Sequence, residues 1–429
     1  MVGSIRAPSR IGSARWIATL AAMTAVTALS IDMSLPAQPT LASTFDVSSE
    51  TAGLTLSIFL IGFALAQLIT GYLADAFGRR RVILGGLALF SVSGVACALS
   101  PSIEVLIACR ALQGIGAAAA PVVARAMVRD TQPAAQAARL LSTMLAALAV
   151  APMIAPVIGG VLLELVGWRA IFATLAVCGV ALYVLARWTL VETLPVERRL
   201  APSLPGLVRG YAMFFRTPGV RLPMLISCAS FAGQFGYIAA SPFVLIDGYG
   251  VSPGDYGFYF ALAALALMLG SLAGGRMLRA GRSPGAMLVI GTSLLLVGGL
   301  LIVAGTRSDL GIVGLMAPLI VFFFGIGITS PSATALALQP VPHIAGTASA
   351  AIGFFSVTAG VLAGYETTRL GGSSPHVLAL VMLGTGAIAA VLAITAAILR
   401  RRGTRATDPA CSSSHGDLAA ERTSSRLSA

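Results

Sequence analysis

The chain has 429 residues, of which 57% are hydrophobic and only 10% are charged, and its mean hydropathy is +0.91. Soluble globular domains carry about 25% charged residues, so this composition excludes an ordinary soluble protein. The net charge of +12 comes entirely from arginine. Because these arginines are spread over many short segments, we expect them to face anionic lipid head groups and expect no nucleic-acid partner.

Twelve apolar runs follow one another, each near the length of about 20 residues that crosses a bilayer as a helix. They cover 16–36, 52–73, 82–100, 104–126, 138–163, 168–190, 222–246, 256–275, 284–306, 311–335, 345–365 and 376–399. No segment between them is long enough for a core of its own. The first run follows three arginines, as in a signal peptide, but it contains Asp32, Pro36 and Pro39, so we expect an uncleaved helix. The sequence therefore predicts an all-α membrane protein with twelve transmembrane helices.

Two halves are indicated by the polar stretch 191–221, which has six runs on each side, and by a repeated glycine spacing. The first copy of the repeat is Gly71, Gly78 and Arg79, and the second is Gly274, Gly281 and Arg282. The predicted organisation is an N-terminal six-helix bundle (1–190), a cytoplasmic linker (191–221), a C-terminal six-helix bundle (222–400) and a disordered cytoplasmic tail (401–429). Pseudo-symmetric bundles of this kind bind substrate between them, near the middle of the membrane.

Arginine positions predict the orientation. Of the 28 arginines, 24 fall in segments on the same side of the membrane as the N-terminus, and three fall in the opposite loops. Arginine is enriched in cytoplasmic loops, so both termini are expected on the cytoplasmic side of the membrane. The cysteines and histidines have no metal-ligand spacing, and a chain without lysine has no nucleotide-binding P-loop. We therefore expect neither an enzyme nor a cofactor.

Two charged residues lie inside predicted helices, where each costs at least ~2.5–3.5 kcal/mol. At ~1.5 Å of rise per residue, Asp32 lies ~24 Å from the cytoplasmic boundary and Arg110 lies ~10 Å from the opposite one, so both fall in the outer half of the membrane. We expect them to face a central cavity and to interact, with Asp32 as the proton carrier. The alternatives are a fixed ion pair that only orients helices, or an Asp32 close enough to the membrane surface to stay hydrated. Gln113, one turn from Arg110, is expected on the same face.

Several segments resemble the major facilitator superfamily. The stretch 71–81 is similar to its helix 2–3 signature, and 110–118 is similar to the helix 4 signature of its proton-coupled members. The stretch 151–160 resembles its helix 5 antiporter motif, with Ala151 and Ala155 in place of glycine; an ordinary proline-kinked helix is the alternative. The motif residues are Pro152, Pro156, Gly159 and Gly160.

Further segments resemble the bicyclomycin-resistance (Bcr/CflA) branch of that superfamily. These are 29–37, 54–69, 124–130, 167–172, 192–199 and 343–349. The resemblance implies the major facilitator fold and an antiporter of the bacterial inner membrane that is driven by the proton gradient. It would work as a monomer and export drug-like molecules by alternating access. Export of a dedicated metabolite is the alternative, and a non-transporting membrane receptor is disfavoured, because it would not need Asp32 and Arg110 within the membrane.

Two further groups of polar residues suggest roles. A cytoplasmic network is expected to close the inner mouth, formed by Gly71, Asp75, Gly78, Arg79, Arg125 and Asp130. For Arg80 and Arg81 we expect contacts with lipid phosphates instead. Candidate substrate-cavity residues are Asp32, Gln67, Gln113, Gln234 and Tyr237. The amide of Gln234 and the phenol of Tyr237 lie three residues apart, as in a mixed polar and apolar pocket, although helix packing explains them equally well.

Overall fold

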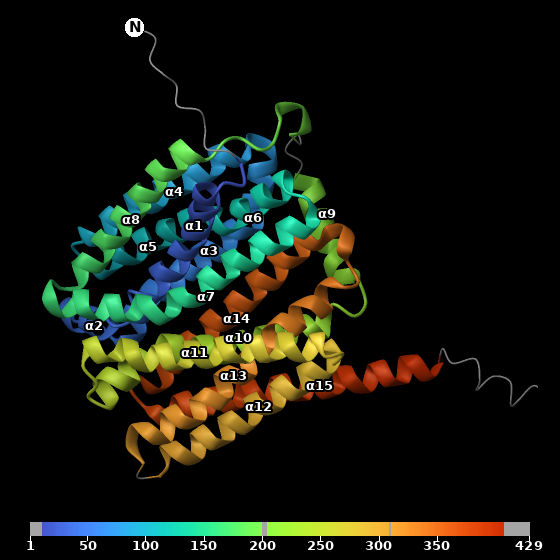
Figure 1. Ribbon diagram of the computed structural model, residues 1–429. Coiled ribbons are helices and arrows are strands. Elements are labelled where there is room, and N and C mark those ends of the chain that lie inside the picture. The colour runs from blue at the N-terminus through green and yellow to red at the C-terminus, as the bar shows by residue number, and fades with distance from the viewer. Residues whose placement is uncertain (1–10, 200–203, 309, 407–429) are drawn as a thin grey trace, which may run out of the picture.

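The computed structural model describes residues 11–199, 204–308 and 310–406, which form helices without any strand (Figure 1). Twelve helical segments are long and apolar enough to cross a membrane. These segments coincide with the twelve predicted runs, and helix α12 has the predicted bounds of 284–306. The all-α membrane fold is therefore confirmed, because hydrophobic length is a local property that the sequence carries directly.

We call α1–α8 the N half. Its helices are α1 Ala14–Asp32, α2 Gln38–Phe45, α3 Ser49–Phe77, α4 Arg79–Ala98, α5 Ile103–Ala117, α6 Ala119–Thr131, α7 Ala134–Leu165 and α8 Trp168–Thr189. Helices α5 and α6 together make one span. We call α10–α15 the C half. Its helices are α10 Arg221–Pro242, α11 Pro253–Arg279, α12 Pro284–Thr306, α13 Gly311–Leu338, α14 Ala345–Gly371 and α15 Pro375–Ala406.

The segment between the halves contains a helix, α9 (Leu204–Arg216), within the predicted linker. The Tyr211 hydroxyl of α9 donates a hydrogen bond to the Leu68 carbonyl of α3, at 3.2 Å, and Phe214 of α9 belongs to a buried apolar cluster of the C half, so α9 contacts both halves. Helix α15 continues to Ala406, beyond the predicted end of the last bundle. The predicted disorder of the tail falls mostly on residues 407–429, which lie outside the described residues.

The repeated glycine turn is present in both halves. Gly78, which ends α3, has φ +98°, and Gly281, which follows α11, has φ +88°. A side chain rarely adopts this backbone conformation, so glycine is required for each helix to stop and the chain to reverse within a few residues. The sequence repeat therefore corresponds to a structural repeat.

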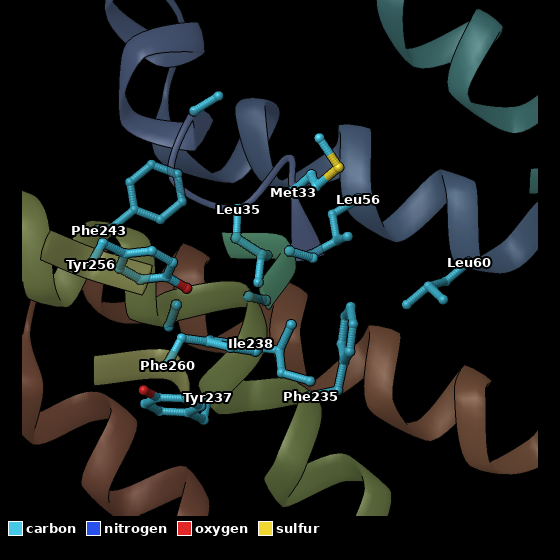
Figure 2. Close-up of a cluster of buried hydrophobic side chains, with 14 of the residues drawn as sticks. Met33, Leu35, Leu56, Leu60, Phe235, Tyr237, Ile238, Phe243, Tyr256 and Phe260 are labelled. Carbon is cyan, nitrogen blue, oxygen red and sulfur yellow. The ribbon is translucent and has the colours of Figure 1, made fainter. Parts of the chain in front are cut away.

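The halves contact each other through two helix pairs, α7 with α11 and α3 with α14. Helices α7 and α11 come together near α2 and separate toward α9 (Figure 1). We call these two ends of the molecule the α2 end and the linker end. At the α2 end, buried apolar side chains of both halves form one cluster. Figure 2 shows Met33, Leu35, Leu56 and Leu60 of the N half beside Phe235, Ile238, Phe243, Tyr256 and Phe260 of the C half.

Candidate functional site

Asp32 is the last residue of α1 and is only 5% exposed. Among the described residues, neither an ion pair nor a hydrogen bond engages its carboxylate, and its environment is defined by burial alone. The next residue, Met33, belongs to the cluster that joins the halves. Tyr256 of α11 lies near Asp32 across this boundary. An acid without a cation partner therefore lies where the two halves meet.

Arg110 on α5 is fully buried inside the N half. Its guanidinium donates to the carbonyls of Thr55 on α3 and Ser30 on α1, both at 3.2 Å, and to Gln113 Oε1 at 2.8 Å. It also lies over the Phe59 ring, 4.2 Å from the centroid. These contacts tie α1, α3 and α5 together through a single side chain.

The expected contact between Asp32 and Arg110 is not an ion pair in this structure. The Arg110 guanidinium reaches α1 at the Ser30 carbonyl, two residues before Asp32, and its other donors are used by Thr55 and Gln113. Backbone carbonyls of the adjacent helices therefore take the place that the carboxylate was expected to fill. The proposed roles of the two residues in proton coupling stay predictions.

Gln113 is buried within the N half. Its Oε1 accepts from Arg110, and its Nε2 lies against Gly94 of α4 and has no hydrogen-bond partner among the described residues. In this conformation Gln113 thus orients Arg110 from inside one half, whereas a substrate-binding role requires a face toward the other half. Gln67 on α3 does face the C half, because its Oε1 lies beside Gly353 of α14.

A network of charged groups surrounds the turn at Gly78. Arg79 forms ion pairs with Asp75 at 2.6 Å and with Asp130 at 3.1 Å. Gly71 packs α3 against Val122 of α6 nearby. All of these residues belong to the N half, so in this conformation the network holds α3, α4 and α6 together rather than joining the halves.

Glu192, just after α8, completes this network and is not among the predicted gating residues. Its carboxylate accepts from the backbone N–H groups of Arg79, at 2.9 Å, and Arg80, at 3.2 Å, which are the first residues of α4. The neighbouring Thr193 hydroxyl donates to Asp130 at 3.2 Å. A carboxylate at a helix N-terminus is stabilised by the unpaired N–H groups and by the helix dipole. The sequence shows that an acid follows the sixth run. It does not show that this acid contacts the start of α4, because that contact depends on the tertiary fold.

Two arginines behave differently from expectation. Arg125, predicted in the network, donates to the Pro121 carbonyl one turn earlier on α6, at 2.8 Å. Five residues along a helix turn by about 140°, so Arg125 and Asp130 lie on different faces. Arg80, expected at lipid phosphates, instead donates to the carbonyls of Leu190 and Arg187 at the end of α8, both at 2.8 Å.

Gly78→Ala is expected to lower the free energy of unfolding more than Gly281→Ala does. Both positions have positive φ, which costs a non-glycine residue about 1–3 kcal/mol. At Gly78 an added Cβ also lies 2.5 Å from Glu192 Oε2 and 3.0 Å from an Arg199 nitrogen, whereas at Gly281 nothing lies within 4 Å. Thermal unfolding of the two variants in detergent measures the difference, and equal losses would show that Glu192 adds nothing to this turn.

Helix α7 contains Pro152 and Pro156 and packs against both halves. The Gly159 backbone closely approaches the Met33 carbonyl of the N half, and the Gly160 backbone closely approaches the Pro253 carbonyl of the C half. An added Cβ would clash with these carbonyls, so both positions require glycine in this conformation. The small residues of the helix 5 motif thus lie at the boundary between the halves, at the α2 end.

Glu164, one turn beyond these glycines, was not predicted from the sequence. Its carboxylate accepts a 2.8 Å hydrogen bond from the Gly254 N–H in the first turn of α11, so an acid of the N half caps a helix of the C half. A charge–dipole contact at an exposed site stabilises by about 0.3–1 kcal/mol. This contact is broken if the α2 end opens.

Glu164→Gln is therefore expected to raise the fraction of molecules open at the α2 end about two- to fivefold, as this energy implies. Spin labels on exposed Ser43 and Ser308, in a background free of other cysteines, measure the distance between the halves at this end. Glu366→Gln is the matched control, because Glu366 pairs with Arg369 on its own helix at 3.5 Å. An unchanged distance distribution in Glu164→Gln would contradict a role for this contact.

The two candidate substrate-cavity residues on α10, Gln234 and Tyr237, lie where the halves meet or within the C half. Tyr237 is fully buried between Phe260 and Phe323, with ring centroids 6.1 and 5.2 Å away. Gln234 is half-buried, one turn away. Within the part of the chain that the structure describes, no group of three or more histidine, cysteine or acidic residues is placed to hold a metal ion.

Comparison with known proteins places this arrangement in a family. Residues 20–365 match the sequence model of the Major Facilitator Superfamily. YdgK of Bacillus subtilis, an uncharacterized MFS-type transporter, is 33% identical over 77% of this chain and 83% of its own length. Multidrug resistance protein D of Escherichia coli K12 is 30% identical over 77% of this chain and 82% of its own length. The bicyclomycin resistance protein homolog of Haemophilus influenzae is 29% identical over 81% of this chain and 87% of its own length.

The likeness to solved structures concerns the fold only. A peptide transporter POT in complex with sulfate superposes with a TM-score of 0.74 at 16% identity, over 92% of this chain and 96% of that one. The twelve helices, the two halves and the sequence relatives agree with one another. The chain therefore belongs to the major facilitator superfamily and is a multi-pass membrane transporter rather than an enzyme.

Proposed function

We propose that this transporter exports small drug-like molecules, of the bicyclomycin or phenicol type, from the bacterial cytoplasm in exchange for protons. Relatives named for multidrug and bicyclomycin resistance cover more than three quarters of the chain and support a drug-like substrate. The arginine distribution supports a cytoplasmic linker end with both termini inside. The transporter works as a monomer, without a cofactor, and takes its energy from the proton gradient.

The burial of Asp32 is the observation that carries the proposal. It is a buried acid without a cation partner among the described residues, at the boundary between the halves. Burying an ionised carboxylate in the membrane costs at least ~2.5–3.5 kcal/mol, whereas the protonated acid costs less. The closed α2 end seen here is therefore the conformation that a bound proton favours. Ionised Asp32 favours the opposite rearrangement, which couples proton movement to the rocking of the halves.

The mechanism follows from this coupling. With the α2 end open, a proton binds Asp32 and the drug leaves; the α2 end then closes, as in this structure. With the linker end open, Asp32 releases its proton to the cytoplasm and the site regains affinity for the drug. The network of Asp75, Arg79 and Asp130 lies at the linker end, where it gates this step.

Drug accumulation in an efflux-deficient bacterium tests the proposal. Cells that express the protein are expected to accumulate less of one or more drugs in a panel that includes bicyclomycin and chloramphenicol, and a protonophore is expected to abolish the difference. Export that survives the protonophore would contradict proton coupling. No effect with any drug, despite confirmed membrane insertion, would favour a dedicated metabolite or a protein that does not transport.

A further inference from the structure

One face of α10 carries a row of polar side chains that the drug-export mechanism above does not use. The row consists of Ser227, Ser230, Gln234, Tyr237 and Ser241. The intervals of three and four residues place all five on one side of the helix, with neighbouring side chains about 5–6 Å apart. We call this face the α10 polar stripe.

Three members of the stripe are buried without a hydrogen-bond partner among the described residues. Ser227 is 7% exposed, and Ser230 and Tyr237 are fully buried, yet none of their hydroxyls is paired. Other buried hydroxyls of this protein, such as Ser91 and Thr292, donate to a carbonyl one turn earlier in their own helix. Leaving a buried polar group unpaired costs about 1–3 kcal/mol. Three unpaired hydroxyls on one helix face therefore indicate bound water rather than packing.

The stripe ends beside Asp32. Ser241 Oγ and the Tyr256 hydroxyl are 2.8 Å apart, and Tyr256 lies near both Tyr237 and Asp32. Figure 2 shows Tyr256 and Tyr237 on the C-half side of the cluster, below Met33 and Leu35 of the N half. From this point the stripe follows α10 toward Arg221, at the opposite end of the span. Polar groups thus extend from the buried acid toward the linker end.

We propose that the α10 polar stripe holds a file of water molecules that carries the proton from Asp32 to the linker end. This inference rests on the proposed function and supplies its exit route. The Asp32 carboxyl breaks its O–H bond and gives the proton to an adjacent water molecule. Each water then forms one O–H bond and breaks another, until a proton is released at the linker end and the carboxylate remains. The rings of Phe260 and Phe323 beside Tyr237 form apolar walls that confine this file.

The path has a specific consequence for coupling. Proton release is a step separate from drug binding, because the unpaired hydroxyls of Ser227 and Ser230 are buried within the C half. Removing them should slow proton movement and leave exchange of drug for drug intact. A purely structural role predicts no such separation.

Reconstituted vesicles that contain a pH-sensitive dye test the proposal. In the double variant Ser227→Ala and Ser230→Ala, drug-driven proton flux is expected to fall at least tenfold. Exchange of labelled for unlabelled drug at equal pH on both sides should stay within twofold of wild type, which also shows that the variant is folded. Using Ser230→Thr in place of Ser230→Ala should recover at least half of the proton flux. Ser91→Ala, which removes a paired hydroxyl on α4, is the control and should change neither rate.

The outcomes are distinguishable. Normal proton flux in the double variant would overturn the water file and leave the proposed function standing. Equal losses of proton flux and drug exchange would overturn it in favour of a drug-binding role for the stripe. No drug-driven proton flux from the wild-type protein would overturn the proposed function and the proton path with it.

Discussion

Asp32→Asn is expected to abolish proton-coupled export while leaving the fold intact. Asparagine has the size of the protonated acid but cannot release a proton, so the α2 end should close normally and the transport cycle should stop. Because no ion pair or hydrogen bond engages Asp32 among the described residues, the substitution breaks none of the contacts seen there. We expect at least a tenfold loss of protonophore-sensitive drug export and an unchanged melting temperature.

Asp46→Asn is the matched control for this experiment. Asp46 is an exposed acid near the same end of the molecule, and its φ of +49° is a conformation that asparagine also tolerates. Export in this control should equal that of wild type. If Asp32→Asn retained proton-coupled export, the coupling acid would have to lie elsewhere in the chain.

Arg110→Lys is expected to be the most destabilising conservative substitution in the N half. Lysine keeps the charge, but its single ammonium cannot reproduce the fork that reaches Ser30 on α1, Thr55 on α3 and Gln113 together. At least one buried carbonyl is then left without its donor, and the stacking on Phe59 is lost. Together these losses amount to about 2–4 kcal/mol.

Thermal unfolding in detergent measures this effect, with Arg307→Lys as the control because Arg307 is exposed. We expect a clear drop in melting temperature for Arg110→Lys, a loss of transport, and no change for the control. A variant that melts and transports like wild type would show that the guanidinium contacts do not hold the three helices together.

The helices were predictable from the sequence, whereas many of the contacts between them were not. Each span is a long, mainly apolar run, and the turns at Gly78 and Gly281 carry the same glycine spacing, so both features are local. The depths of Asp32 and Arg110 were estimated from position along a helix, which does not fix the direction in which a side chain points. The carbonyls of Ser30 and Thr55 decide the placement of Arg110, and carbonyl positions cannot be read from residue types.

The contacts of Glu192 at the linker end and Glu164 at the α2 end could not be predicted from the sequence for the same reason. Glu192 and Glu164 are ordinary polar residues near the ends of apolar runs, and their caps on α4 and α11 depend on which helices become neighbours. The α10 polar stripe was partly visible, since Gln234 and Tyr237 were candidates from their spacing. Serines are common in membrane helices, however, and only the structure distinguishes the unpaired hydroxyls of Ser227 and Ser230 from paired ones.

Drug uptake into inside-out membrane vesicles tests proton-coupled export most directly. In such vesicles the cytoplasmic side faces the medium, so export is measured as accumulation of labelled drug when the interior is made acidic. We predict that the wild-type protein concentrates the drug against its gradient, that a protonophore collapses this accumulation, and that Asp32→Asn never establishes it. Accumulation that persists without a pH gradient, or is equal in Asp32→Asn, would contradict the account.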